Sequence, residues 1–388
     1  MADRAPYLNA RLQGFTTTIF AEMSALALAT GSVNLGQGYP DTDGSAEIAE
    51  AAIAAIRDGH NQYPPGPGVL VLREAIAEHQ RAFYGLDYDP ESEVLVTTGA
   101  TEAIAATLLA LCEVGDEVVM FEPFYDSYAA CAALAGAHLR VVPLDPPDWS
   151  FDPGALQDAI TSSTRLVLVN SPHNPTGKVF NHAELSAIAE LCVQHDLLAV
   201  TDEVYEHLIF EGVHLPLAGF PGMRERTVTI SSAGKTFSFT GWKVGWACAS
   251  PPLVAAVRSV KQFLTYVSGA PFQYAIAGAL AAGSRYFEPI ANELRTGRDL
   301  FCAGLADIGF EVYRPAATYF VTTDISPIDE GDAMAFCMGL PERCGVVAIP
   351  SSVFYADPES GRSLVRWAFS KRLEVLDAAL GRLQRLAR

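Results

Sequence analysis

The chain has 388 residues, of which 50% are hydrophobic and 18% are charged, and its formal net charge is −19. This length exceeds that of one ordinary domain, and the composition is typical of a folded protein with a large core, which excludes a disordered chain. The strong negative charge argues against a surface that binds nucleic acid or anionic membranes.

The cysteines and the first residues indicate the compartment. The seven cysteines are odd in number and include no Cys-x-x-Cys pair, so we expect reduced core cysteines, with neither a disulfide framework nor a metal site. The opening residues lack the apolar core of a signal peptide, and no span reaches transmembrane length. We therefore expect a soluble cytoplasmic protein.

Apolar runs alternate with helical patterns from residue 46 to about residue 284. Seven runs predict strands covered on both faces, because apolar residues fill them without alternation. These runs lie at 94–98, 117–121, 139–144, 165–170, 197–201, 227–231 and 244–249. With helices predicted at 101–111 and from about Tyr125, the fold class is α/β, with a mostly parallel sheet flanked by helices. Ligands bind such sheets at the carboxyl ends of the strands.

The pattern changes near residue 285. A long helix is predicted at 286–308 and a terminal helix after Arg372. Short strands are predicted at 310–313, 319–323, 346–349 and 364–369. We expect a smaller α+β domain over 285–388, packed with the N-terminal segment 1–45, beside a large ligand-binding domain over 46–284.

Lys235 lies in the most informative stretch of the chain, residues 231–243. Only five of the 26 basic residues are lysines, so arginine is the usual surface cation. A lysine amine can lose its proton and act as a nucleophile, which a guanidinium cannot. With small residues before it and Lys243 after it, Lys235 predicts a Schiff-base lysine beside a phosphate. The alternative is a solvent-facing lysine at a strand end.

Small residues after the first of these predicted strands indicate an anion site. Gly99, Ala100 and Thr101 join a strand end to a helix start and expose backbone N–H groups there. An ordinary turn has the same pattern. The chain contains no Gly-x-Gly-x-x-Gly pattern and no P-loop, so neither a dinucleotide fold nor a nucleotide-triphosphate site is supported.

Three polar residues complete the pattern. Asn174 lies in a loop that two prolines make rigid, although a plain turn is possible. Asp202 follows a buried strand and needs a cationic partner, unless it caps a helix. Arg366 lies in an apolar strand and predicts a substrate carboxylate held in a bidentate fork, with a structural salt bridge as the alternative. The order of these features indicates a pyridoxal 5′-phosphate site.

From about Leu12 to the C-terminus, the chain resembles the fold-type-I pyridoxal-phosphate aminotransferases of class I/II. The sequences that carry this resemblance are 170–177, 201–205 and 233–243. Residues 33–38, 61–63 and 122–128 resemble the kynurenine, glutamine and methionine transaminase branch. Residues 20–26 and 63–68 are most similar to enzymes known as N-succinyldiaminopimelate aminotransferases of lysine biosynthesis.

The resemblance implies roles around the cofactor ring. Lys235 would condense with the cofactor aldehyde and then move the Cα proton. Asp202 would pair with the pyridinium nitrogen, while Asn174 and Tyr205 would bond the phenolic oxygen. Tyr125 would stack on the ring. The cofactor supplies the carbanion chemistry and the protein supplies orientation and electrostatics.

The resemblance also implies phosphate and substrate contacts. The phosphate would be held by Ala100, Thr101, Ser232 and Lys243, with Tyr63 reaching across from a second subunit of a homodimer. The substrate α-carboxylate would be bound by Gly38, Asn174 and Arg366.

Departures from the family pattern bear on the substrate. Phe20 stands where kynurenine transaminases have a tryptophan beside the substrate, and Ser268 and Gly269 replace a Phe-His pair that closes the pocket from the partner subunit. Both changes enlarge the site, which favours N-succinyl-LL-diaminopimelate as amino donor and 2-oxoglutarate as acceptor. Ala317 replaces a usual glycine.

The predicted reaction is a ping-pong transamination. One alternative is a broad kynurenine, glutamine or methionine transaminase, with β-elimination from cysteine conjugates as a possible side activity. A remote alternative is a non-catalytic, cofactor-binding regulator. That function needs a basic helix-turn-helix domain, whereas this chain is acidic and begins its fold near residue 10.

Overall fold

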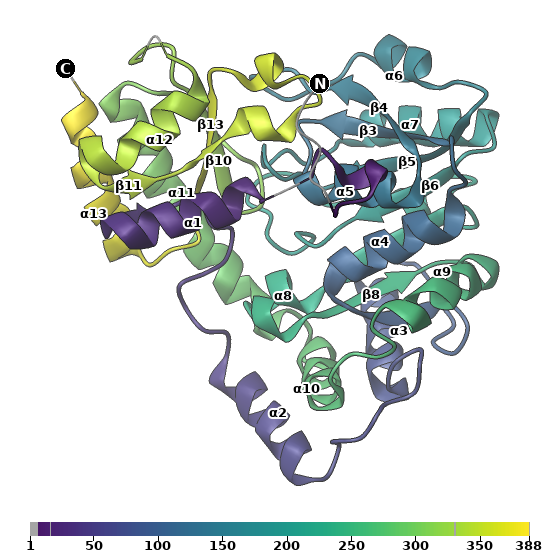
Figure 1. Cartoon of the computed structure of the whole chain (residues 1–388). Coiled ribbons are helices and arrows are strands. Elements are labelled where there is room, and N and C mark those ends of the chain that lie inside the picture. Colours follow the sequence, from purple (N-terminus) through teal and green to yellow (C-terminus); the bar gives the residue numbers. More distant parts are fainter. Residues whose placement is uncertain (1–6, 16, 330, 388) are drawn as a thin grey trace.

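The computed structural model describes residues 7–15, 17–329 and 331–387, and a seven-stranded sheet dominates its right half in Figure 1. The strand order is β2-β8-β7-β6-β5-β3-β4, and all neighbours are parallel except those of the antiparallel β8. The strands are β2 (Val94–Thr98), β3 (Glu117–Glu122), β4 (His138–Pro143), β5 (Thr164–Asn170), β6 (Leu198–Asp202), β7 (Thr227–Ser232) and β8 (Val244–Cys248). The mostly parallel sheet is therefore confirmed, and each predicted strand lies within one residue of its observed bounds.

Strand β4 differs from the prediction that the strands are covered on both faces. It is an edge strand that pairs with β3 alone, and His138 and Arg140 are exposed along it. Strand β3, which lies inside the sheet, is buried over most of its length. Solvent beyond an edge strand tolerates polar side chains, which a central strand excludes.

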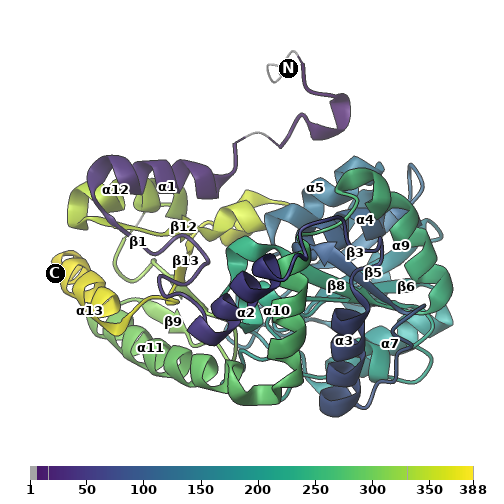
Figure 2. The same ribbon diagram turned by 90° about the horizontal axis from the view of Figure 1, so that it is seen from below.

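Helices cover both faces of this sheet, as Figure 2 shows from below. Neighbouring residues Val118 and Val119 belong to different cores, because side chains alternate between the faces of a strand. Val118 shares a core with α4 (Gly99–Leu111), α5 (Asp126–Ala135) and α9 (Pro251–Leu264). The opposite face packs against α6 (Pro153–Ala159), α7 (His182–Gln194), α2 (Ala46–Arg57), α3 (Leu70–Tyr84) and α10 (Ala270–Ala281).

A second, antiparallel sheet has the order β12-β13-β10-β9 and lies in the other half of Figure 1. Its strands are β9 (Glu311–Tyr313), β10 (Phe320–Asp324), β12 (Ile349–Pro350) and β13 (Leu364–Ala368). One core joins it to α1 (Ile19–Thr30), α11 (Phe287–Ile308), α12 (Ala333–Cys344) and α13 (Leu373–Leu383). The predicted helices at 286–308 and after Arg372 are confirmed as α11 and α13.

The single strand predicted at 346–349 is wrong. It consists of two short strands, because β11 (Val346–Val347) pairs with the N-terminal β1 (Val33–Asn34) while β12 pairs with β13. The residues of both short strands are buried. Their hydrophobicity therefore could not show where the pairing partner changes.

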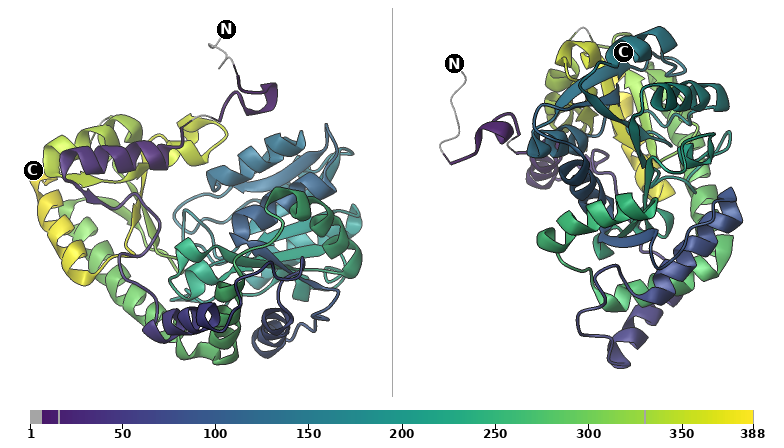
Figure 3. Two further views of the ribbon diagram at one scale, coloured as in Figure 1. Left: turned by 60° about the horizontal axis from the view of Figure 1, so that its bottom comes forward. Right: turned by 90° about the vertical axis from the view of Figure 1, so that its right-hand side faces the viewer.

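The N-terminal segment packs against C-terminal elements. Figure 3 shows the purple α1 among the yellow and green elements of the last third of the chain. Leu35 N–H donates to Val347 O at 2.8 Å, and Met23 shares a core with Trp367. On this basis we propose the domain division 1–45, 46–284 and 285–388.

Two expectations concern the ends of the chain and its helices. Residues 1–6, on which the expectation of no signal peptide depended, lie outside the described residues. Within the part that the structure describes, we find no helix both long and apolar enough to cross a bilayer.

All seven cysteines are buried, as predicted.

The alanine at 317 fits its backbone. Positive φ falls on the next residue, Thr318, at 69°, and not on Ala317. Ala317 is fully buried and its N–H donates to Gly177 O at 2.9 Å. No glycine is therefore required at this position.

Candidate active site

A cavity of about 1170 Å³ lies at the carboxyl ends of the central strands of the large sheet. Strand β13 and helix α1 contribute to its opposite wall. Twelve of the thirteen predicted site residues line this cavity, which are Phe20, Gly38, Ala100, Thr101, Tyr125, Asn174, Asp202, Tyr205, Ser232, Lys235, Lys243 and Arg366. The thirteenth, Tyr63, does not.

The predicted anion site is the N-terminus of α4. Gly99 has φ of +75° and begins the helix directly after β2, so the first N–H groups of the helix have no intrahelical acceptor. A Cβ built on Gly99 would lie 3.1 Å from Lys243 Nζ, which places this amine beside the helix start. The helix dipole and the lysine both favour an anion here.

Gly245 on β8 is required for this arrangement. A Cβ there would lie 2.5 Å from the carbonyl carbon of Gly99 and 2.8 Å from Ala100 N, so backbone would have to move. We expect Gly245→Ala to cost about 1–3 kcal/mol of stability through overpacking and to weaken cofactor binding. Urea unfolding and absorbance titration with pyridoxal 5′-phosphate measure these effects. Gly241→Ala is the control, because its Cβ would meet no atom within 4 Å; equal behaviour of the two variants would contradict the prediction.

Lys235 lies on the short helix α8 (Ala233–Thr236), which directly follows β7. Its Nζ donates to Gly38 O at 3.4 Å and lies 5.8 Å from the centroid of the Tyr205 ring. The amine is therefore inside the cavity and not at a solvent-facing strand end. It faces the N-terminal segment across the site.

Asp202 ends β6 and is buried. Tyr128 donates its hydroxyl to Asp202 Oδ2 at 2.6 Å, and Val204 N–H donates to Oδ1 at 3.3 Å. No described helix begins directly after Asp202, so the helix-capping alternative is wrong. Burial raises the pKa of this carboxyl to about 6, despite the Tyr128 hydrogen bond that lowers it. A cationic partner would stabilise the ionised form.

This raised pKa predicts a pH dependence of stability. The ordinary pKa of 3.8 applies to the unfolded chain, so the folded chain binds this proton more tightly. The resulting stabilisation is present at low pH and is lost as pH rises from about 4 to about 6. The shift corresponds to about 3 kcal/mol. We expect the cofactor-free wild type to lose about this much unfolding free energy over that window relative to Asp202→Asn. Urea unfolding at several pH values tests it, and parallel profiles would contradict it.

Arg366 lies on β13 and is 1% exposed. Its Nη1 donates to Asn174 Oδ1 at 3.1 Å and its Nη2 to Gly36 O at 2.9 Å, while Nε has no described partner. No carboxylate of a described residue lies within 4.0 Å, so the salt-bridge alternative is wrong. Burial lowers the pKa of the guanidinium to about 10, which leaves it charged at neutral pH. A buried cation with an open donor can accept an anion.

Aromatic rings frame this guanidinium. Its Cζ lies 4.1 Å from the Phe320 ring centroid, 4.9 Å from that of Phe354 and 5.1 Å from that of Phe20. Phe20 also packs against Tyr125, with ring centroids 6.4 Å apart. The rings restrict the guanidinium, so its fork is oriented before a ligand arrives.

Asn174 is held by a neighbouring asparagine. Asn170 Oδ1 accepts from Asn174 N–H at 2.7 Å, and Asn170 Nδ2 donates to Asp202 O at 2.8 Å. These bonds tie the loop that carries Asn174 to the end of β6. This role of Asn170 was not predicted from the sequence.

Two further tyrosines at the site were also missed. Tyr128 is the buried donor to Asp202 described above, and Tyr319 donates to Gly38 O at 2.6 Å. The ring of Tyr319 meets that of Tyr205 edge-on at 5.3 Å. A buried carboxylate such as that of Asp202 needs a hydrogen-bond donor, which predicts that a donor exists. No spacing in the sequence shows that this donor is Tyr128.

Tyr63 lies in the loop between α2 and α3 and is 81% exposed. Its ring meets that of Tyr266 edge-on at 5.4 Å. Ser268 is buried and accepts from Gln273 Nε2 at 3.0 Å, and neither it nor Gly269 lines the cavity of its own chain. The roles predicted for these residues involve a second subunit and stay predictions.

One cavity thus combines a lysine amine, a buried carboxylate, an anion-binding helix start and a buried arginine. This combination of groups is typical of transaminases, which bind a phosphorylated cofactor and a substrate α-carboxylate.

Comparison with known proteins agrees. The family model Aminotransferase class I and II matches residues 30–381, and the chain belongs to this family. It is 54% identical to the Probable N-succinyldiaminopimelate aminotransferase DapC of Mycobacterium tuberculosis, over 97% of this chain and 98% of the relative. It is 40% identical to the Methionine aminotransferase of Escherichia coli, over 97% and 98%. A solved structure of N-succinyldiaminopimelate aminotransferase from M. tuberculosis has a TM-score of 0.95 and 54% identity, covering 98% of this chain and all of that one. The chain is therefore a transaminase, and the alternative of a non-catalytic regulator does not hold.

Proposed function

We propose that this aminotransferase uses pyridoxal 5′-phosphate to move the amino group of N-succinyl-LL-diaminopimelate to 2-oxoglutarate. The observation that carries the choice of substrate is the 54% identity, over nearly the full length of both chains, to a relative with that name. Phe20, smaller than the tryptophan of kynurenine transaminases, supports a wider cavity.

The residues of the cavity suit this cofactor. The helix start at Gly99, with Thr101, Ser232 and Lys243, offers N–H, hydroxyl and ammonium donors to a phosphate. The buried Asp202 carboxylate suits a protonated ring nitrogen, because burial raises its pKa and a positive charge beside it would stabilise the ionised form.

The bound cofactor supplies an aldehyde carbon and a ring that accepts the electrons of the substrate Cα–H bond. Lys235 would take the proton from the substrate Cα as a base and would later return a proton as an acid, so its amine would serve in both roles. Asp202 keeps a proton on the ring nitrogen. Tyr205 and Asn174 would donate to the phenolic oxygen of the cofactor.

Arg366 orients the substrate. Its guanidinium fork holds the substrate α-carboxylate. The Nε donor, which has no partner among the described residues, is available for this contact. Gly38 and Asn174 would complete this contact, while Phe20 and Tyr125 border the substrate and the ring. Fixing the carboxylate would place the Cα–H bond near Lys235, which lines the same cavity.

We also propose that the enzyme is a homodimer in which Tyr63 reaches the phosphate of the partner subunit. The exposed aromatic residues Tyr63, Phe263 and Tyr266 support this, because large apolar side chains seldom gather on a free surface. Sedimentation analysis of the purified protein measures the assembly. A monomer with full activity would contradict the proposal.

A broad methionine-type transaminase is the second candidate. Among the described residues that line the cavity, the cations are Lys235, Lys243 and Arg366, all assigned above to the cofactor and the α-carboxylate. The distal carboxylates of a succinylated substrate therefore find no further cation among the described residues that line this cavity. Methionine needs none, and the relative from E. coli bears that name.

A half-reaction titration distinguishes the two candidates. The purified holoenzyme is mixed with N-succinyl-LL-diaminopimelate, methionine, glutamine, kynurenine, phenylalanine or glutamate, and the loss of cofactor absorbance is followed. A clear preference for the succinylated compound supports the first proposal. Preference for methionine, glutamine or kynurenine would replace it with the second, and release of pyruvate from a cysteine conjugate would reveal β-elimination.

A further inference from the structure

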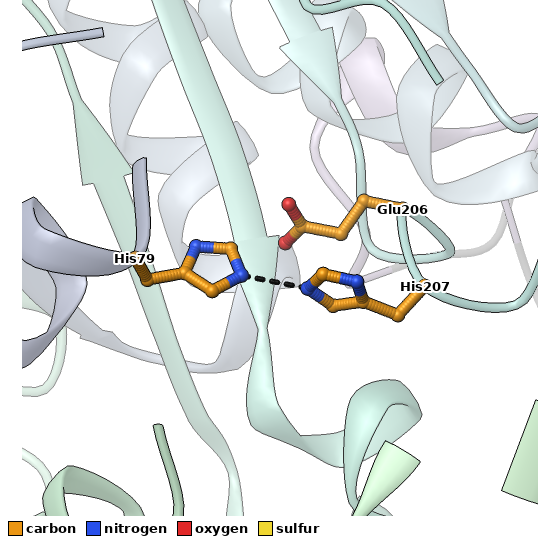
Figure 4. Close-up of side chains that lie close together, drawn as sticks. All are labelled: His79, Glu206 and His207. Carbon is orange, nitrogen blue, oxygen red and sulfur yellow. Dashed lines mark hydrogen bonds between the residues drawn. The ribbon is translucent and has the colours of Figure 1, made fainter. Parts of the chain in front are cut away.

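Three ligand-type side chains converge on the face of the large sheet opposite to the cavity. Figure 4 shows the imidazole of His79, from α3, facing that of His207, with the Glu206 carboxylate beside them. The two Nε2 atoms lie 2.6 Å apart, and one ligand atom from each of the three residues lies within 4.8 Å of the others. Ser231 donates to Glu206, whereas its neighbour Ser232 lines the cavity, so the two sites lie on opposite faces of β7.

Among the described residues, only histidines lie close enough to balance the charge of Glu206. The residue is 3% exposed, and its two oxygens accept from the neutral hydroxyls of Tyr84, at 2.6 Å, and Ser231. No lysine or arginine of the described residues lies within 4.0 Å of it. The nearby His214 is engaged with Glu203 at 2.8 Å. A buried carboxylate requires a cation, and the two facing imidazoles are the groups best placed to hold one.

His79 gives a second, independent indication. It is 3% exposed, and its Nδ1 has no partner among the described residues. Its Nε2 points at another imidazole nitrogen, although two lone pairs cannot face each other without a proton or a metal ion between them. An N–H of one ring can fill this place with a hydrogen bond, and a metal ion bound to both nitrogens would fill it as well.

We propose that His79 Nε2, His207 Nε2 and one oxygen of Glu206 bind a divalent transition-metal ion, best matched by zinc, with water in the fourth position. Two imidazoles and one carboxylate form a known zinc donor set. Tyr84 and Ser231 hydrogen-bond the carboxylate, as outer groups do around metal ligands. This site departs from the expectation of no metal, which was drawn from the cysteines alone.

The geometry needs a small adjustment to hold the ion. Zinc–nitrogen bonds of about 2.0–2.1 Å at tetrahedral angles place two nitrogens about 3.3 Å apart, so the rings must separate slightly from 2.6 Å. His207 is half-buried in the loop after β6, with its ring stacked on that of Phe287 at a centroid distance of 3.9 Å, so His79 or His207 must shift by a few tenths of an ångström to admit the ion.

The ion has a positioning role. It would join α3 to the loop that carries Tyr205, two residues before His207, and Tyr205 lines the active-site cavity. The ion would contact neither substrate nor cofactor. Its loss is expected to lower the melting temperature and leave the reaction chemistry in place.

Metal binding by the untagged holoenzyme tests the proposal. The protein is stripped with a chelator, titrated with Zn²⁺ and Co²⁺, and analysed for bound metal after gel filtration. We expect one ion per chain, a visible Co²⁺ absorption of four-coordinate type, and a higher melting temperature with Zn²⁺. His207→Asn should weaken binding by about 100-fold or more. His195→Asn is the matched control, because that histidine is exposed and lies outside the cluster.

Two variants keep the test decisive if one folds poorly. Glu206→Gln keeps one acceptor oxygen, for either Tyr84 or Ser231, and removes the charge, and it should also lose the ion. Cofactor absorbance and circular dichroism report folding in each variant. Wild-type protein that retains no metal, or equal affinity in wild type and His207→Asn, would overturn the proposal. Metal content is independent of transaminase activity, so failure here leaves the proposed reaction untouched.

Discussion

Lys235→Ala is expected to abolish transamination while the protein stays folded. The amine is the only lysine Nζ that lies close to both Gly38 O and the Tyr205 ring among the described residues, and no other base in the cavity occupies its place. Proton transfer by a positioned group contributes about 10²–10⁴-fold to a rate. Loss of both the base and the attachment point should lower turnover by at least about 10⁴-fold. Steady-state transamination and single-turnover absorbance changes measure this effect.

Two lysine variants serve as controls for this result. Lys235→Arg keeps the charge and much of the bulk but cannot supply a neutral amine, so it should be equally inactive. Lys371→Ala removes a lysine that donates to Tyr39 O outside the active-site cavity, and it should keep nearly full turnover. Full activity of Lys235→Ala would refute the assignment of this residue.

Arg366→Ala is expected to impair capture of the amino acid far more than capture of the cofactor. Hydrogen bonds to charged groups contribute about 1.5–3 kcal/mol each. Loss of a two-bond fork should therefore lower kcat/KM by about 10²–10⁴-fold. The change also removes the donors to Asn174 and Gly36, so some loss of stability is expected.

The affinities of Arg366→Ala for the cofactor and for the amino acid, compared with each other, distinguish a substrate-binding role of Arg366 from a structural one. The dissociation constant of pyridoxal 5′-phosphate should change little in Arg366→Ala, while the half-reaction with the amino acid slows. Arg366→Lys keeps a charge but not the fork, and it should fall between wild type and alanine. An equal loss of cofactor affinity and substrate capture would mean that Arg366 is structural.

Local patterns in the sequence predicted the large sheet well. Each of the seven apolar runs became a strand, and for all but the edge strand β4 the reason is that burial on both faces demands apolar side chains whatever the partner strand is. The residues that follow these strands lie together for the same reason, since carboxyl ends of parallel strands share one edge. Asp202 and Ser232 are examples.

Predictions that required a pairing partner were less successful. Residues 346–349 appeared as one strand, although β11 and β12 belong to different sheets. The exposed edge of β4 was also missed, because the position of a strand within a sheet is set by the order of all the strands.

The sequence by itself determined the strands and helices of the large sheet and the chemical types of the active-site groups, because these depend on short windows of polarity and on reactive side chains. Only the tertiary structure decided which distant residues meet. Tyr128 reaches Asp202 from 74 positions away, Asn174 meets Arg366 across 192, and His79 meets His207 across 128. Such contacts arise from strand order and helix packing, which act over the whole chain, so no local window contains them.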